Sequence, residues 1–120
     1  MILVDTSVWV DHFRRDNRVL STLLLEGRVL CHPFVIGELA CGNLRARSTI
    51  LEHLLQLPEA PVADQREVLS LIERRKLWGT GIGWVDAHLL ASAVLAGSTL
   101  WTKDKTLAKQ AQRLKVATER

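Results

Sequence analysis

The chain has 120 residues, enough for one domain with a single hydrophobic core but too few for two. Apolar residues make up 48% of it and its mean hydropathy is +0.09, values typical of a folded globule rather than a disordered chain. No apolar run approaches the ~18 residues needed to span a bilayer, and the opening run is too short for the core of a signal peptide. We therefore expect a cytoplasmic protein.

The net charge of +3 comes from 16 Lys and Arg against 13 Asp and Glu. If four of those 13 acids gather in one site, nine remain to oppose the 16 bases. Solvated helix faces would explain each cluster of bases singly, but together with an acidic centre they indicate a polyanionic substrate or an acidic partner. The clusters are Arg14, Arg15 and Arg18; Arg45 and Arg47; Arg74, Arg75 and Lys76; and Lys103, Lys105 and Lys109.

Cys31 and Cys41 both lie among apolar residues. We interpret them as small buried hydrophobic side chains rather than as a disulfide. With His32 they could also begin a zinc site, although the other three histidines show no paired-ligand spacing that would complete one.

The first predicted element is a strand at Ile2–Val4, a short apolar run that suits a parallel sheet covered on both faces. Asp5 stands at the carboxyl end of this strand, where open α/β sheets bind ligands, although one acid alone would also fit a turn. Thr6 or Ser7 is expected to cap the helix that follows, because either hydroxyl can accept from an unpaired N–H.

Helices are expected next at 8–13 and 19–25, followed by a short strand at 29–31. Pro33 fits the first turn of another helix, which ends near Gly42. Glu38 lies inside that helix with apolar neighbours on several sides. It is either an edge residue that reaches solvent or part of a site.

An amphipathic helix is predicted at 48–57, and a brief strand at 62–63. Asp64 is expected to cap a helix that runs to Leu77. The glycine-rich stretch 79–83 does not match the Gly-x-Gly-x-x-Gly spacing of a nucleotide-binding loop. We interpret it as a flexible approach to the next helix.

That helix, Trp84–Ala96, has Asp86 in its first turn, where the helix dipole favours an acid whatever its function. A strand at 99–102 is expected to lead into Asp104, which could simply cap the last helix, Lys105–Arg113. Residues 116–118 are predicted to form a final edge strand.

Strands and helices that alternate along the chain predict an α/β fold with a parallel sheet and right-handed crossovers. In such a sheet the ends of the first and fourth strands can be neighbours, which would bring Asp5 and Asp104 together, with Asp86 beside them. Two unit charges ~4 Å apart repel by about 4 kcal/mol at an effective dielectric of 20. A divalent cation relieves this repulsion, and Mg²⁺ or Mn²⁺ suits oxygen ligands better than Zn²⁺. An all-oxygen site beside basic surface favours metal-assisted phosphodiester hydrolysis with water as nucleophile.

Four segments, in this order and spacing, resemble PIN-domain ribonucleases, in particular the VapC toxins of bacterial toxin–antitoxin pairs. They are residues 4–9 (Val-Asp-Thr-Ser-Val-Trp), Glu38, residues 83–91 (Gly-Trp-Val-Asp-Ala-His-Leu-Leu-Ala) and residues 100–105 (Leu-Trp-Thr-Lys-Asp-Lys). The resemblance covers nearly the whole chain. It implies a single PIN-like domain over 1–120, with three layers (α/β/α) around a mainly parallel sheet of four or five strands.

The resemblance also implies the site and its cofactor: Mg²⁺, for which Mn²⁺ can substitute, held by four acids, of which Asp5 and Asp86 are the surest ligands. Many members carry a further acid just after the last of the four, and residues 105–107 supply none, which leaves occupancy of a second metal site open. The implied catalytic residues are Asp5, Glu38, Asp86, Asp104 and, near the attacking water, Thr102.

Similarity to VapC proteins implies an endoribonuclease toxin of a type II toxin–antitoxin system that blocks translation by cutting structured RNA. It implies a homodimer, and a VapB-type antitoxin that covers or invades the active site. We expect apolar surface around Trp9 and Phe13 to anchor that antitoxin, with a place in the core as the alternative for Trp9.

Other classes fit less well. A haloacid-dehalogenase-type phosphatase needs a second acid two residues after the first, where this chain has Ser7, and a phospho-receiver domain needs an acidic pair after the first strand. A Ser-His-Asp hydrolase would need a Gly-x-Ser-x-Gly elbow, which the sequence lacks. A catalytically dead fold that only binds RNA or a partner would lack one of the four acids, and all four are present.

Overall fold

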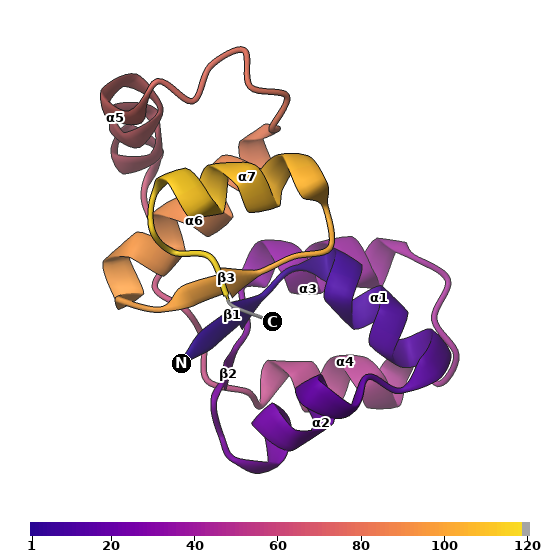
Figure 1. Cartoon of the computed structure of the whole chain (residues 1–120). Helices are drawn as coiled ribbons and strands as arrows, with labels where there is room; N and C mark the ends of the chain where they lie inside the picture. The colour runs from indigo at the N-terminus through magenta and orange to yellow at the C-terminus, as the bar shows by residue number, and fades with distance from the viewer. Residues whose placement is uncertain (119–120) are drawn as a thin grey trace.

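The computed structural model describes residues 1–118. Its centre is a sheet of three parallel strands, β1 (Ile2–Val4), β2 (Val29–Leu30) and β3 (Thr99–Trp101), in the order β2-β1-β3 (Figure 1). Leu3 lies opposite Leu30 on one side and Leu100 on the other. Because β1 is buried throughout, an all-apolar run suits it, as expected for the centre of a parallel sheet.

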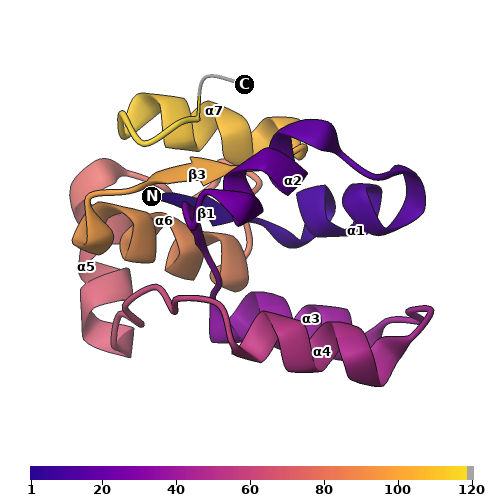
Figure 2. The ribbon, with the colours of Figure 1, turned by 90° about the horizontal axis from the view of Figure 1, so that it is seen from below.

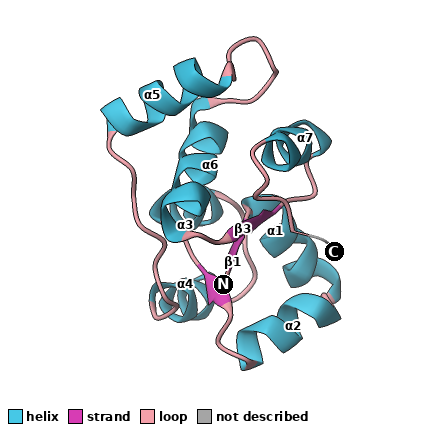
Figure 3. Ribbon diagram, turned by 60° about the vertical axis from the view of Figure 1, so that its left-hand side comes forward, coloured by secondary structure: helices cyan, strands magenta, loops and turns pink. Residues whose placement is uncertain are grey.

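Helices cover both faces of this sheet. Those labelled α1, α2 and α7 lie on one face and α3, α4 and α6 on the other, while α5 packs against α6 farther out (Figures 2 and 3). The predicted α/β fold with three layers is therefore confirmed. None of the helices in residues 1–118 has the length and apolar character to cross a membrane. Their bounds are α1 Thr6–Arg15, α2 Arg18–Leu25, α3 Pro33–Cys41, α4 Arg47–Leu55, α5 Gln65–Arg75, α6 Trp84–Ala96 and α7 Lys105–Arg113.

The sheet has three strands rather than four or five. At the β2 edge, no strand forms at 62–63; a single parallel bridge joins Cys31 to Glu59 instead. Glu59 lies between Pro58 and Pro61, and proline lacks the N–H that a longer ladder would need. Two prolines therefore limit this edge to one bridge.

At the β3 edge, the expected strand at 116–118 is likewise reduced to one bridge, between Leu100 and Ala117. The Leu100 N–H donates to the Val116 carbonyl at 2.7 Å, and the Thr118 N–H donates to the Leu100 carbonyl at 3.3 Å. The chain thus lies beside β3 as predicted, but the paired stretch is too short to count as a strand.

The start of α1 differs from the expectation. The helix begins at Thr6, Asp5 is its N-cap residue, and no side chain caps it. The Thr6 hydroxyl donates to Glu38 and the Ser7 hydroxyl to Asp5. The prediction that one of these hydroxyls caps the helix was wrong, because both are used between elements.

Trp9 belongs to the core, which overturns its proposed role as an exposed anchor. Its side chain is 2% exposed, and the Phe13 ring stacks on it with centroids 5.8 Å apart. Phe13 is half-buried and remains partly accessible. A position one turn into α1 points toward the sheet, so an apolar residue there serves packing.

The two cysteines are both free and have different environments. Cys31 is buried, and burial raises the pKa of its thiol to about 11. Cys41 is exposed, so its interpretation as a buried hydrophobic residue was wrong. It is the last residue of α3, where the helix leaves the core and its side chain meets solvent.

Candidate active site

Parallel pairing of β1 and β3 brings Asp5 and Thr102 together. Val4 lies opposite Trp101, and the Asp5 N–H donates to the Trp101 carbonyl at 2.9 Å. The next residue of each strand therefore lies at the same edge of the sheet. There the Thr102 hydroxyl donates to Oδ2 of Asp5 at 2.7 Å, and Asp5 is only 7% exposed. The result is a nearly buried carboxylate held by a hydroxyl that comes almost a hundred residues later.

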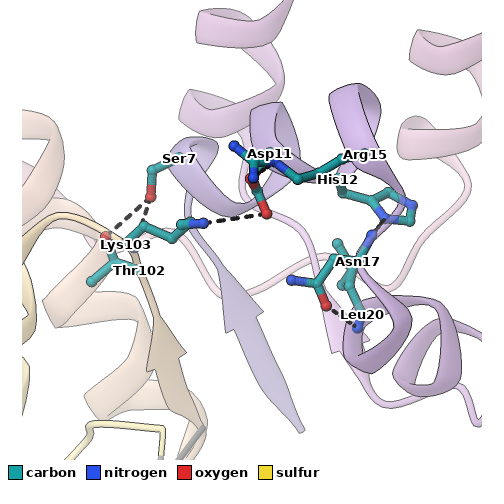
Figure 4. Close-up of polar contacts among 8 residues, drawn as sticks. All are labelled: Ser7, Asp11, His12, Arg15, Asn17, Leu20, Thr102 and Lys103. Atoms are coloured by element: carbon teal, nitrogen blue, oxygen red, sulfur yellow. Dashed lines mark hydrogen bonds and ion pairs between the residues drawn. The ribbon is translucent and has the colours of Figure 1, made fainter.

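Ser7 ties the same two strand ends together. Its hydroxyl donates to Oδ2 of Asp5 at 3.0 Å and lies 3.3 Å from the Thr102 hydroxyl oxygen. It also accepts the Lys103 N–H at 2.9 Å, from the segment that follows β3 (Figure 4). Asp5 Oδ2 thus has two hydroxyl donors that are themselves fixed.

Lys103 lies over the outer side of α1. Its ammonium is 3.3 Å from Oδ2 of Asp11, whose Oδ1 is 3.2 Å from the Arg15 guanidinium (Figure 4). The Asp11 side chain is 14% exposed, whereas those of Lys103 and Arg15 are 51% and 78% exposed. Asp11 therefore holds two solvent-facing cations, of which Lys103 lies two residues beyond the end of β3.

Asp104 has a local structural role in addition to its place near Asp5. Its Oδ1 accepts the N–H groups of Thr106 at 2.9 Å and Leu107 at 3.2 Å, which caps α7 as the sequence suggested. Its own N–H donates to the Thr102 hydroxyl at 3.0 Å. The strand end, the acid and the helix start therefore form one connected turn.

Glu38 reaches the site from the opposite layer. It lies in α3 and is exposed, which agrees with the alternative of an edge residue that meets solvent. Its Oε1 nevertheless accepts the Thr6 hydroxyl at 2.7 Å, and α1 packs against α3. Because Thr6 adjoins Asp5, this bond holds the Glu38 carboxylate beside the start of α1.

Asp86 gives the clearest sign that the four acids converge. It stands in the first turn of α6, and its Oδ2 accepts the Gly83 N–H at 3.1 Å. Burial raises the pKa of its carboxyl above the usual value, the Gly83 bond opposes this rise, and the charges of the other three acids add to it. The three acids that raise it are Asp5, Asp104 and Glu38. We call these four carboxylates the acidic centre.

The donor chemistry of the acidic centre suits a hard divalent cation. Its side chains offer carboxylate oxygens, which Mg²⁺ and Mn²⁺ prefer. Burial is the main cause of the raised pKa of Asp86, and the charges of the other three acids add to it. In residues 1–118, no three His, Cys, Asp or Glu side chains lie close enough together to form a metal site by themselves. A cation at this centre would therefore need water or substrate oxygens among its ligands.

An aromatic row joins the starts of α3 and α6, the helices that carry Glu38 and Asp86, and was not recognised in the sequence. The Trp84 ring lies 4.7 Å from His88, at an interplanar angle of 86°. The His88 ring lies 4.6 Å from Phe34, whose ring is 5.0 Å from His32. Both histidines are buried, and burial lowers the pKa of each, that of His32 to about 4, so the row is uncharged at neutral pH. We call these four rings the aromatic row.

No separate role was predicted for Ser7, Thr6 or Asp11. The first two were interpreted only as helix caps, because a hydroxyl after a strand has that role most often. Asp11 and Lys103 are 92 positions apart, and nothing local pairs them. The one available signal was the Asp-Thr-Ser triplet, which places two hydroxyls directly after an acid.

Comparisons with known proteins identify the family of this chain. The PIN-domain family model matches residues 2–112. Two relatives, each named "Ribonuclease VapC32", come from Mycobacterium tuberculosis strains CDC 1551 / Oshkosh and ATCC 25618 / H37Rv. Each is 50% identical to this chain over 108 residues, which cover 89% of this chain and 87% of the relative. The chain therefore belongs to the PIN-domain family and, with these relatives, to its VapC-type ribonucleases.

Proposed function

We propose that this chain is the toxin of a type II toxin–antitoxin system, an endoribonuclease that hydrolyses RNA phosphodiester bonds and so inhibits translation. It depends on Mg²⁺, for which Mn²⁺ can substitute, and its catalytic carboxylates form the acidic centre. The observation that carries the proposal is the placement of the acids: Asp5 and Asp104 share the Thr102 hydroxyl, and Thr6, next to Asp5, bonds to Glu38. The ribonuclease name of its relatives supports the same reaction.

Each acid offers an oxygen toward a cation. Among the hydrogen bonds of residues 1–118, both donors to Asp5 use Oδ2, and both N–H donors to Asp104 use Oδ1, so the second oxygen of each remains available. Glu38 and Asp86 likewise have one oxygen engaged and one available. When bound, a divalent cation supplies Lewis acidity and the positive charge that admits a phosphate to this centre.

The remaining residues orient the Asp5 carboxylate, the attacking water and the RNA backbone. Thr102 and Ser7 fix the orientation of the Asp5 carboxylate, because both hydroxyls donate to its Oδ2. The Thr102 hydroxyl is next to the Asp5 oxygen where the attacking water is expected, so it can help to position that water. Lys103, held near the strand end by Asp11, offers a cation to the RNA backbone.

We further propose that the protein acts in the cytoplasm as a homodimer and is silenced by a VapB-type antitoxin. A groove of about 640 Å³ beside the acidic centre suits such a partner. Its walls combine apolar side chains with Arg14, Arg45 and Glu38. Phe13, rather than the buried Trp9, is its aromatic contact, and apolar surface of this kind anchors a peptide better than charge does.

A cleavage assay with one matched pair of variants tests the proposed reaction. Wild-type protein should cut single-stranded RNA with Mg²⁺ or Mn²⁺ and stop on addition of EDTA. Glu38→Gln keeps the shape of the side chain and removes its charge, so it should reduce the cleavage rate at least 100-fold, in the range lost when one stabilising group is removed from an active site, roughly 10²–10³. Glu73→Gln, the same change on an exposed face of α5, is the control and should cut as wild type.

Two results would contradict the mechanism. Full activity in EDTA would refute metal dependence. Wild-type turnover by Glu38→Gln would remove Glu38 from the acidic centre and leave it as a surface residue bonded to Thr6.

A further inference from the structure

Trp84 exposes a large aromatic side chain at the start of α6, the helix that carries Asp86. It is the first residue of α6, two positions before Asp86, and it is 43% exposed. Trp9, by comparison, is 2% exposed and lies in the core. Tryptophan is highly buried on average, so an exposed indole next to a reactive site suggests that something covers it in use.

The aromatic row holds this indole in place. Trp84 contacts His88, which is buried and contacts Phe34 in turn, so the exposed ring rests on a support that extends into the core. A side chain that is already fixed loses little conformational entropy when a ligand covers it. Trp84 is therefore prepared to bind a flat partner at low cost.

The geometry of the contact leaves a binding face. In an edge-to-face pair, one ring gives its edge and the other its face. Whichever ring gives its edge, at least one face of the Trp84 indole is not used by His88, given the interplanar angle of 86°. An unpaired nucleobase is a flat π system that binds such faces, and it does so with little dependence on base identity.

The neighbouring charges fit a nucleic acid. Lys103 and Lys105 are exposed on either side of Asp104, where they can meet the phosphates of a strand whose scissile phosphate lies at the acidic centre. We propose that Trp84 stacks on an unpaired base of the RNA, next to the phosphodiester bond that is cut. This inference rests on the ribonuclease function proposed above.

Trp78 provides a matched control. It is 59% exposed and lies in the loop before α6. Among the aromatic ring pairs of residues 1–118, none includes Trp78, so its indole lacks the support that Trp84 has. Three glycines, at 79, 81 and 83, separate it from the helix. Removing either indole is the same chemical change, but only one of the two is anchored beside Asp86.

Binding is measured in EDTA, where the proposed reaction does not proceed, by the fluorescence anisotropy of a short labelled single-stranded RNA of mixed sequence. Trp84→Ala should weaken binding roughly 5- to 150-fold, the range for loss of one base–aromatic stack. Trp84→Phe should restore most of the affinity, and Trp78→Ala should bind as wild type. Wild-type affinity in Trp84→Ala, or an equal loss in Trp78→Ala, would overturn the assignment.

A second measurement separates stacking from a general structural effect. RNAs that lack one base at a time are bound to wild type and to Trp84→Ala. Wild type should lose affinity at one position next to the cleaved bond, and the variant should lose nothing further there. If both proteins respond equally at every position, no base stacks on Trp84.

The same samples distinguish the remaining outcomes. Sedimentation reports whether Trp84→Ala changes the oligomeric state; a change that accounts for the whole loss of RNA affinity would mean that the indole contacts a second copy, which contradicts the stacking. Cleavage by wild type in Mg²⁺ is scored separately. Binding without cleavage would contradict the function proposed above, whereas cleavage with unchanged binding by Trp84→Ala would contradict the stacking alone.

Discussion

At the scale of single residues, Thr102 has three partners that depend on its hydroxyl. It donates to Asp5 at 2.7 Å, accepts the Asp104 N–H at 3.0 Å and lies 3.3 Å from the Ser7 hydroxyl oxygen. Thr102→Val keeps the shape and leaves a nearly buried carboxylate with one donor fewer, which should lower the free energy of unfolding by about 1–3 kcal/mol. RNA cleavage should fall with it. Thr102→Ser keeps the hydroxyl and should retain both the stability and the cleavage rate of wild type. Denaturant unfolding and cleavage rates of the two variants check this.

Asp86 should make the metal-free protein sensitive to pH. Burial, and then the neighbouring acids, raise the pKa of its carboxyl above the ordinary 3.8. The folded state therefore holds this proton more tightly than the unfolded state, so the stability due to Asp86 is fully present below about pH 3.8 and is lost as pH rises through the raised pKa. Asp86→Asn should match wild type at the acidic end and be the more stable protein at neutral pH. Thermal unfolding of both proteins in EDTA across this pH range is the test. Equal melting temperatures at neutral pH would show that the pKa of Asp86 is not raised in the folded state.

At the scale of elements, Asp104 joins a helix cap to the acidic centre, and two substitutions separate these roles. Asn caps helices as well as Asp does, so Asp104→Asn should leave α7 intact and reduce RNA cleavage strongly. Asp104→Ala should reduce cleavage and also cost about 1 kcal/mol of stability, since the cap is lost. Denaturant unfolding together with cleavage rates compares the two. Full activity in Asp104→Asn would show that Asp104 serves α7 alone.

The elements that the sequence predicted well are those with strong local signals. The apolar run at Ile2–Val4, Pro33 at the start of α3 and the Asp64 cap of α5 each match the structure. In the capping box of Asp64, the Glu67 N–H donates to Oδ1 of Asp64, and the Glu67 carboxylate accepts the Asp64 N–H. Helix starts and buried strands are set by neighbours in the chain, and this is why periodicity and caps were enough to place them.

What the sequence could not provide depends on distant partners. Cys41 and Trp9 both follow apolar residues, yet one is exposed and the other is core, because only packed layers decide which side of a helix meets solvent. The bonds of Ser7 to Asp5 and Lys103 span up to 96 positions. The order of the four acids along the chain indicated a site, but the hydroxyls and cations that support it became apparent only once β1 and β3 were paired.

At the scale of the whole molecule, the proposed metal site should couple metal binding to stability. Its four acids come from the end of β1, α3, α6 and the start of α7, so a cation held by them would stabilise the folded state alone. Mg²⁺ at 100 times its dissociation constant should add about 2.7 kcal/mol to the free energy of unfolding. Calorimetry in Mg²⁺ and in EDTA measures the rise in melting temperature. Asp86→Asn should show a smaller rise, and no rise in wild type at saturating Mg²⁺ would count against a shared metal site.

The sheet order β2-β1-β3 also determines when the acidic centre can form during translation. Its central strand is the first to leave the ribosome, but β3 and the Thr102 donor to Asp5 follow 97 positions later. At about 5–20 residues per second, the nascent chain waits roughly 5–20 s between the two. Through that interval Asp5 has no Thr102 beside it, and Asp104 has not yet been added. Translation that stops before β3 would therefore release a chain without the acidic centre. The proposed nuclease activity could arise only after nearly all of these residues have been synthesised.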